Sequence, residues 1–111
     1  MAATIQKYTD FWPFYLQEHS DRRNRVLHYI GSTLVFVALA AALWTRNWWL
    51  LLLMPLAGYF FAWVGHFGVQ KNRPATFTYP FWSLISDFRM YFTWLGGGLE
   101  RELEKYQVRQ N

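Results

Sequence analysis

Two long apolar runs without acidic or basic side chains dominate the hydrophobic pattern of the chain. The first covers residues 27–44 and the second covers residues 48–67. Each is close to the ~20 residues that an α-helix needs to cross a hydrocarbon core of about 30 Å. Only Thr45-Arg46-Asn47 separates them, so we predict an antiparallel transmembrane hairpin with helices over 20–44 and 47–71. The alternative, a soluble protein with two buried core helices, would need a larger core than this chain offers.

Shorter segments precede the predicted hairpin. Thr9-Asp10 is a capping signal and predicts a short interfacial helix over 10–19, with its aromatic side chains at the lipid boundary. Ser20-Asp21 offers a second N-cap, at which the first membrane helix is expected to begin. Pro55 lies inside the second apolar run and predicts a kink there.

The segment after the hairpin is predicted to be a loop and then a helix. Two prolines bracket residues 72–80, which are therefore expected to form the loop. A helix is expected over 81–107, bent or ended by the glycines at 96–98. Asp87 and Arg89 would each cost about 2.5–3.5 kcal/mol at a bilayer centre, so this helix should lie in the interface or pack on the hairpin. The predicted fold is all-α, a single membrane domain of about four helices built on the hairpin.

The composition agrees with a membrane protein. Hydrophobic residues make up 53% of the 111 residues and aromatic residues 22%, and such rings accumulate at the headgroup level of bilayers. The chain has no cysteine, which excludes disulfides and thiolate metal ligands. Most basic residues flank the apolar runs, and this favours contact with anionic lipid over binding of nucleic acid. The N-terminal segment carries acidic residues and lacks a short apolar core, so we do not interpret it as a signal peptide.

The basic residues predict the orientation of the hairpin. Three arginines within 22–25 precede it and Lys71 and Arg73 follow it, whereas its tip carries only Arg46. The positive-inside rule therefore places both ends of the hairpin on the cytoplasmic side. The membrane would be the inner membrane of a bacterium or the endoplasmic reticulum of a eukaryote.

The three histidines of the chain are expected at one membrane face. His28 lies 18 residues before Arg46 and His66 lies 20 residues after it, so their depths along the hairpin differ by only about 3 Å. His19 ends the predicted interfacial helix on the same side. His19 and His28 are nine residues apart and would face opposite sides of one continuous helix, so they can converge only if the chain breaks at Ser20-Asp21.

Amide side chains accompany the histidines. Asn24 lies four residues before His28 and Gln70 four residues after His66, so each pair shares a helix face, and Asn72 follows closely. Imidazole ligands suit iron, zinc and copper, and a metal site is one interpretation of this group. The other is that the histidines are hydrogen-bonded anchors and that the asparagines cap or cross-link helices.

Two stretches carry a resemblance to a known family. The sequences FWPFYLQEHSDRRNRVLHYIG and GYFFAWVGHFGVQKNRPATFTYPFWSLISDFRMY resemble the Mpo-like membrane protein family over Phe11 to Tyr91. The family pattern is a His, then an Asn and a His on one helix, then Gly-His-x3-Glu-x-Asn/Arg-x-Pro-Ala. It matches His19, Asn24, His28 and the stretch 65–75, except that Gln70 replaces the usual Glu.

The resemblance implies an activity, because the named fungal member of the family is an Fe(II)-dependent 2-hydroxy fatty acid dioxygenase of the endoplasmic reticulum. It implies α-oxidation, in which O2 is used to remove one carbon from a 2-hydroxy fatty acid. It also implies that the Fe(II) ligands are His19, His28 and His66. The residues that support these ligands, or that are possible further ligands, would be Gln70, Asn24 and Asn72. The basic residues that guide the substrate carboxylate would be Arg22, Arg23, Lys71 and Arg73. We expect Gln70 to accept an imidazole N–H rather than to bind iron, since the three histidines already form an adequate set of Fe(II) ligands.

Two other functions remain open at this point. His28 and His66 on facing helices are also suitable axial ligands for a b-type haem. A non-catalytic membrane scaffold, in which these polar residues only tie helices together, is the third hypothesis.

Overall fold

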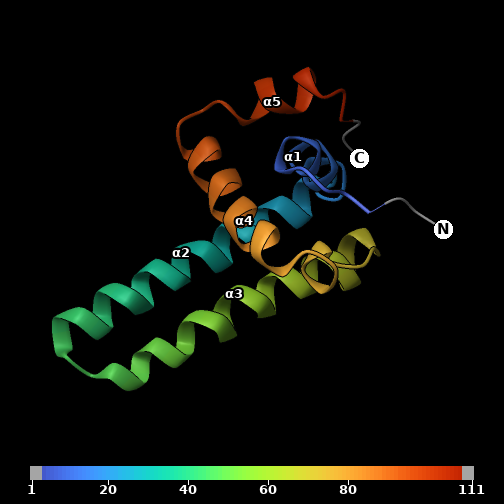
Figure 1. Cartoon of the computed structure of the whole chain (residues 1–111). Helices are drawn as coiled ribbons and strands as arrows, with labels where there is room; N and C mark the ends of the chain where they lie inside the picture. Colours follow the sequence, from blue (N-terminus) through green and yellow to red (C-terminus); the bar gives the residue numbers. More distant parts are fainter. Residues whose placement is uncertain (1–3, 109–111) are drawn as a thin grey trace.

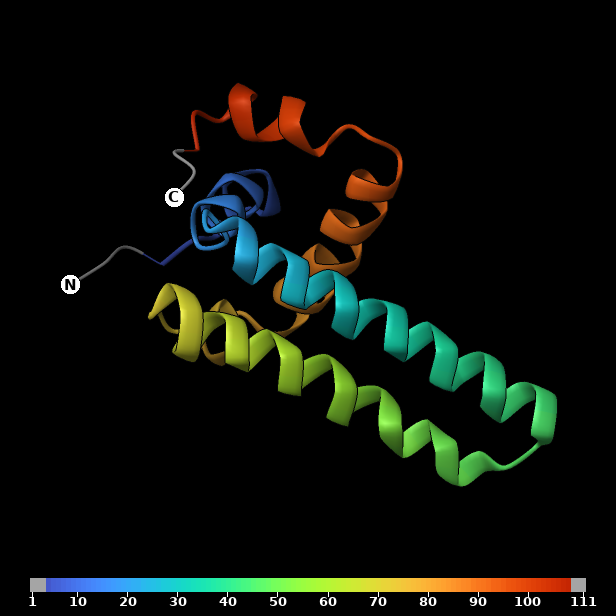
Figure 2. The same cartoon turned by 180° about the vertical axis from the view of Figure 1, so that it is seen from behind.

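A long helical hairpin projects from a group of shorter helices in the computed structural model (Figures 1 and 2). The structure describes residues 4–108, which contain helices and no strand, as the all-α prediction requires. The elements in chain order are α1 (Tyr8–Gln17), α2 (Arg22–Thr45), η1 (Trp48–Leu52), α3 (Leu53–Trp63), η2 (Val64–Gln70), η3 (Ala75–Phe77), α4 (Pro80–Leu95) and α5 (Leu99–Lys105).

The two arms of the hairpin differ in regularity. The first arm is α2, and the second is a succession of a 3₁₀ segment (η1), an α-helix (α3) and a π-helix (η2). At the tip Arg46 adopts a left-handed conformation with φ of 57°, and the Asn47 side chain accepts a hydrogen bond from the Trp49 N–H at 3.3 Å. Pro55 lies in the first turn of α3, where a missing N–H is tolerated, and closely follows the change from the 3₁₀ segment η1 to the α-helix.

The hairpin has the length and surface of a membrane-spanning unit. Its arms, Arg22–Thr45 and Trp48–Gln70, are 24 and 23 residues long and apolar enough to cross a membrane. Large apolar side chains cover the surface of its distal half: Trp44 is 89% exposed, Trp49 79% and Leu56 66%. A surface of this kind marks contact with a partner or with lipid.

Most aromatic side chains of α1 are buried, which corrects the prediction that these side chains lie in lipid. Phe11, Trp12, Tyr15 and Leu16 are all 1% exposed or less. Their spacing places them on one face of the helix, and this face packs in a core with residues of α4 and α5. The helix also begins at Tyr8 rather than Asp10, with no side-chain cap.

The helix α4 connects α1 to the hairpin. Its Ser86 shares a hydrogen bond of 2.9 Å with the Tyr8 hydroxyl, and its Tyr91 hydroxyl shares one of 2.8 Å with Thr33 on α2. The Arg89 guanidinium lies 4.0 Å above the Trp12 ring, so this charge is placed against an aromatic face. The glycines end α4 at Leu95, and therefore the single helix predicted over 81–107 is two helices.

A tight contact between the hairpin arms gives the first test. A Cβ added at Gly31 would lie 3.2 Å from the Phe61 Cβ and 3.3 Å from the Ala57 carbonyl oxygen. We expect Gly31→Leu to lower the free energy of unfolding by about 1–3 kcal/mol, because overpacking costs that much. Gly68→Leu is the matched control, since only one atom, 4.0 Å away, is near its Cβ position. Equal thermal stability of the two variants in detergent would contradict this packing of the arms.

Candidate metal centre

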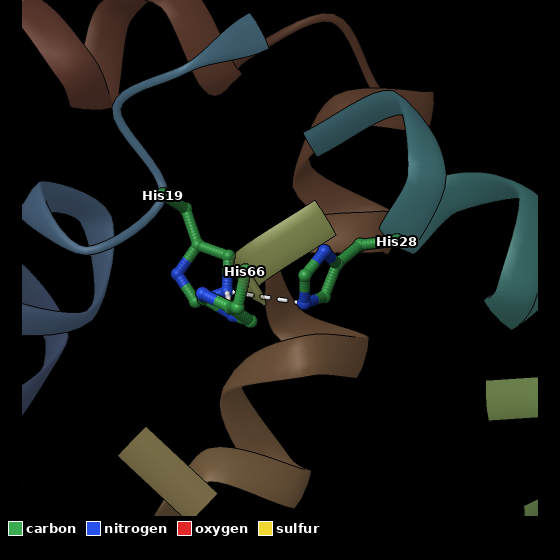
Figure 3. A group of neighbouring side chains, drawn as sticks. All are labelled: His19, His28 and His66. Carbon is green, nitrogen blue, oxygen red and sulfur yellow. Dashed lines mark hydrogen bonds between the residues drawn. The ribbon is translucent and has the colours of Figure 1, made fainter. Parts of the chain in front are cut away.

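The three histidines converge on one buried point, as the sequence predicted (Figure 3). The chain breaks between α1 and α2, where the Asp21 side chain accepts from the Arg23 N–H at 2.9 Å and caps α2. This break brings the Nε2 atom of His19 to 3.2 Å from that of His28 and 3.0 Å from that of His66. All three ligand atoms lie within 4.8 Å of one another.

Backbone carbonyls fix the protonation of the first two rings. The Nδ1 atom of His19 lies 2.7 Å from the Tyr15 carbonyl oxygen, and the Nδ1 atom of His28 lies 2.9 Å from the Asn24 carbonyl oxygen. A carbonyl oxygen only accepts, so each Nδ1 must carry the hydrogen and donate it. The Nε2 atom of each neutral ring is then an unprotonated lone pair.

An amide fixes the third ring in the same way. The Asn72 side chain donates from Nδ2 to the Glu18 carbonyl oxygen at 2.9 Å, and this bond leaves its Oδ1 atom facing His66. The His66 Nδ1 lies 2.7 Å from that oxygen and donates to it. The Nε2 lone pair of His66 therefore also points to the centre of the group.

Three lone pairs at this separation repel one another unless a cation lies between them. Burial lowers the pKa of His19 well below its usual range, and the neighbouring His28 and His66 lower it further, so protonation does not relieve the repulsion. Nitrogen ligands about 2.1 Å from a metal and at right angles to each other lie about 3.0 Å apart. The two Nε2 separations from His19, 3.2 Å to His28 and 3.0 Å to His66, match this value. Each ring also donates its other N–H to an oxygen, as metal-binding histidines do.

Asn24 packs directly against the turn that carries His66. A Cβ added at Gly65 would lie 2.0 Å from the Asn24 Oδ1 atom, so only glycine leaves room for this side chain. Asn24 is fully buried, and its Nδ2 donates to the Gln70 Oε1 atom at 2.9 Å. The predicted association of Asn24 and Asn72 with the histidines is therefore seen in the structure.

Gln70 lies beside the group but makes no hydrogen bond to a histidine in the described chain. Its Oε1 accepts from the Asn24 side chain and from the Asp21 N–H at 3.3 Å, and its Nε2 donates to the Ser20 hydroxyl at 2.9 Å. The predicted bond from an imidazole N–H to Gln70 is wrong, because Asn72 takes that place. The reason is the π-helix η2, whose i→i+5 pattern does not stack position 70 over position 66 as an α-helix would.

Arg25, which the sequence assigns only to the basic cluster before the hairpin, is a supporting residue of the site. Its side chain is 2% exposed, and its Nη1 donates to the carbonyl oxygens of His19 and Ser20 at 2.8 and 3.0 Å. It thereby fixes the chain break that positions His19. Its spacing of three residues from His28 was the available signal, since it puts both residues on one face of α2.

The basic residues expected to guide a substrate carboxylate lie away from the histidines. Arg23 is 76% exposed and forms an ion pair with Asp21 at 2.9 Å. The four residues with this predicted role are all exposed; they are Arg22, Arg23, Lys71 and Arg73. In the described part of the chain, none of them lines either of the two cavities next to the histidines. Any guidance of a carboxylate by these residues would therefore act from the surface.

Two adjoining cavities open from the histidine group. A small one is lined by all three histidines and by Ser83 of α4. A larger one of about 360 Å³ lies between α2, α3 and α4 and is mostly apolar. The two share four lining residues, so the histidine group and the apolar cavity are continuous; the shared residues are His28, Tyr59, Ala62 and Asp87.

Asp87 is a second residue that the sequence did not assign to the site. The Tyr15 hydroxyl donates to its Oδ1 atom at 2.5 Å, and the Tyr15 ring stacks on the His19 ring with centroids 4.0 Å apart. Burial raises the pKa of Asp87 to about 7, and the bond from Tyr15 opposes this rise. Burial also raises the pKa of Tyr15 well above its usual value, so Tyr15 stays a hydrogen-bond donor.

Comparison with known proteins identifies the family. A family model described as 2-hydroxy-palmitic acid dioxygenase Mpo1-like matches residues 5–99. The chain therefore belongs to the Mpo1-like family, as the sequence motifs predicted. Searches of curated proteins and of solved structures found no match.

Substitutions at position 70 test its role as a support. Gln70→Glu keeps an acceptor for the Asp21 N–H and the Asn24 amide, so we expect metal affinity close to that of the wild type. Gln70→Leu leaves both donors unpaired and should lower metal affinity about 10–100-fold, as other changes to supporting residues do. Metal titration of the purified proteins measures both. A large gain in affinity in Gln70→Glu would mean that position 70 binds the metal directly.

Proposed function

We propose that the protein is an Fe(II)-dependent dioxygenase that shortens 2-hydroxy fatty acids by one carbon. The observation that supports this most strongly is the convergence of three unprotonated Nε2 atoms, from His19, His28 and His66, on one buried point. The family match supports the reaction and the substrate class. Each ring also has an oxygen that holds its Nδ1 hydrogen, so the group is organised for a metal before one binds.

The residues fit a non-haem iron centre better than the two alternatives. A b-type haem with His28 and His66 as axial ligands would need its ring plane between them, where His19 and its Tyr15 support lie. A purely structural group of helix ties would be expected to join donors to acceptors, whereas here lone pairs face one another. Fe(II) binds imidazole well, and three neutral histidines leave other coordination positions open.

The cavities fit a fatty acid whose head group enters from the histidine side. The larger cavity is lined mostly by apolar side chains of α2, α3 and α4, and its volume lies in the range of about 300–1,000 Å³ typical of ligand sites. It reaches the surface beside Tyr59 and Leu84, which are 41% and 49% exposed. An acyl chain would lie in this cavity while the carboxyl end reaches His28 at its inner end.

The proposed reaction balances without an external reductant. A 2-hydroxy acid and O2 give the acid with one carbon less, carbon dioxide and water, because oxidation of the substrate supplies all four electrons that O2 accepts. Bound Fe(II) would supply the site at which O2 and the two head-group oxygens of the substrate meet. The protein holds three imidazoles in the Nδ1–H tautomer, excludes water by burying them, and directs the acyl chain into the apolar cavity.

Metal content and product analysis test this function together. We expect purified protein loaded anaerobically to bind about one Fe(II) per chain and to convert 2-hydroxypalmitic acid in air to the acid with one carbon less. His19→Ala and His66→Ala should each lose both properties, because each removes one of three ligands. Iron analysis and mass spectrometry of the fatty acids give the two readouts.

An exposed residue provides the matched control for these histidine variants. Gln17 lies at the end of α1, and its side chain donates to the Tyr106 carbonyl oxygen outside the site. Gln17→Ala should keep iron and activity. Folded histidine variants that retain full iron occupancy, or a wild-type protein that binds iron yet leaves 2-hydroxypalmitic acid unchanged, would refute the proposal.

We further propose that the hairpin spans a membrane with the metal centre on the cytoplasmic side. The exposed basic residues of the hairpin ends, Arg22, Arg23 and Lys71, surround the end that carries the centre. The distal tip carries Trp44 and Trp49, both largely exposed, which suit the opposite headgroup region. The membrane would be the bacterial inner membrane or the endoplasmic reticulum.

Reporter fusions test this orientation. A reporter inserted after Asn47 should be periplasmic or lumenal, because the positive-inside rule retains the basic ends in the cytoplasm. The same reporter at the N-terminus should be cytoplasmic and serves as the control. A cytoplasmic signal from the insertion at Asn47 would show that the hairpin does not cross the membrane in this way.

A further inference from the structure

Two polar side chains on α4 line the cavities next to the histidine group. Ser83 lines the small cavity together with the three histidines, and Asp87 lines both cavities one helical turn further along. Asp87 does not belong to the group of side chains close enough to hold a metal ion, and the Ser83 hydroxyl has no hydrogen-bond partner within the described chain. Their side chains are therefore available to a molecule that occupies the cavities.

Ser83 has a polar atom that lacks a partner. The side chain is 2% exposed, and its Oγ atom forms no hydrogen bond within the described chain. A buried hydroxyl without a partner costs about 1–3 kcal/mol. Its position in the wall of the small cavity is where a ligand oxygen would satisfy it.

The two carboxyl oxygens of Asp87 differ in their contacts. Oδ1 accepts from the Tyr15 hydroxyl, whereas Oδ2 accepts no hydrogen bond from residues 4–108. Because Tyr15 also stacks on His19, its hydroxyl holds the Asp87 carboxyl in a fixed position relative to the histidine group. Asp87 lies where the small cavity meets the larger one, most of whose wall is apolar.

From this order of side chains we infer that Ser83 and Asp87 recognise the head group of a 2-hydroxy acid, with Ser83 donating to the carboxylate and Asp87 accepting from the 2-hydroxyl. Along such a substrate the carboxylate comes first, the 2-hydroxyl second and the acyl chain third. Along the cavity wall the sequence is Ser83, then Asp87, then apolar residues such as Phe88. This inference rests on the proposed function and makes Asp87 the specificity-determining residue for the hydroxyl group.

The selectivity of binding tests the inference without turnover. Iron-loaded protein in lipid nanodiscs is titrated anaerobically with 2-hydroxypalmitic acid and with palmitic acid, each competing with a fluorescent fatty acid. The ratio of the two dissociation constants largely cancels partitioning into lipid. Asp87→Ala should lower the preference for the hydroxy acid about 10–100-fold, the range for a hydrogen bond to a charged group. Its affinity for palmitic acid should stay within about threefold of the wild-type value, because palmitic acid has no hydroxyl to bind Asp87.

Two further variants keep the test decisive. Asp87→Asn is nearly isosteric and can still accept from Tyr15, but it presents an NH2 group that cannot accept the hydroxyl hydrogen, so the preference should also fall at least about tenfold. It decides the question if Asp87→Ala does not fold. Ser83→Ala should weaken binding of both acids by a similar factor, since both carry the carboxylate.

Ser86→Ala is the matched control. Ser86 is also buried on α4, but its hydroxyl is bonded to Tyr8 and it lines neither cavity. Its substitution should leave the preference unchanged. An unaltered preference in folded, iron-containing Asp87→Ala and Asp87→Asn would overturn the inference and leave the proposed function standing. A wild-type protein that binds neither iron nor 2-hydroxypalmitic acid would overturn both.

Discussion

The mutual repulsion of three imidazole lone pairs is the constraint on which the rest of the structure depends. Each Nδ1 hydrogen is committed to an oxygen, from Tyr15, Asn24 and Asn72, so the three Nε2 atoms have no hydrogen to share. Bringing the His19 Nε2 atom to 3.2 and 3.0 Å from the other two is unfavourable in the metal-free chain. The surrounding contacts offset this cost: the buried Arg25 fixes the break before α2, and the absence of a side chain at Gly65 admits Asn24. Such an arrangement is expected when selection acts on the metal-bound state, since a cation converts the repulsion into attraction.

Much of this arrangement could be predicted because it depends on local rules. The apolar runs fixed the hairpin, its arm lengths placed His28 and His66 at similar depth, and the capping signal at Ser20-Asp21 indicated the break that lets His19 join them. The role of the Tyr8–Gln17 helix could not be predicted in the same way. Its aromatic residues are equally suited to a lipid interface and to a core, and only the tertiary position of α4 and α5 decides that Phe11 and Trp12 are buried.

The error at Gln70 has a different physical origin. The prediction assumed that residues four apart share a face, which holds for an α-helix. The second arm ends as a π-helix, where the wider turn directs Gln70 to Ser20 and Asp21 and leaves the His66 Nδ1 to Asn72. Gln70 therefore supports the loop that carries His19 instead of the ring of His66. The sequence contains no proline or insertion that would signal this change of winding. A Glu at the same position could accept from the same donors.

The position of the centre within the hairpin also bears on how a fatty acid would reach it. The histidines lie at the end of the hairpin near the exposed basic residues, and the larger cavity leads from them along the arms, where the neighbouring surface is apolar. An amphiphile that enters from a bilayer can keep its acyl chain in apolar surroundings throughout, and only its head group needs to leave lipid. The largest desolvation cost then falls on the carboxylate, and a metal cation held by the histidines would offset that cost. A soluble enzyme would have to extract the whole chain from the membrane first, so the proposed reaction and the apolar hairpin support one another.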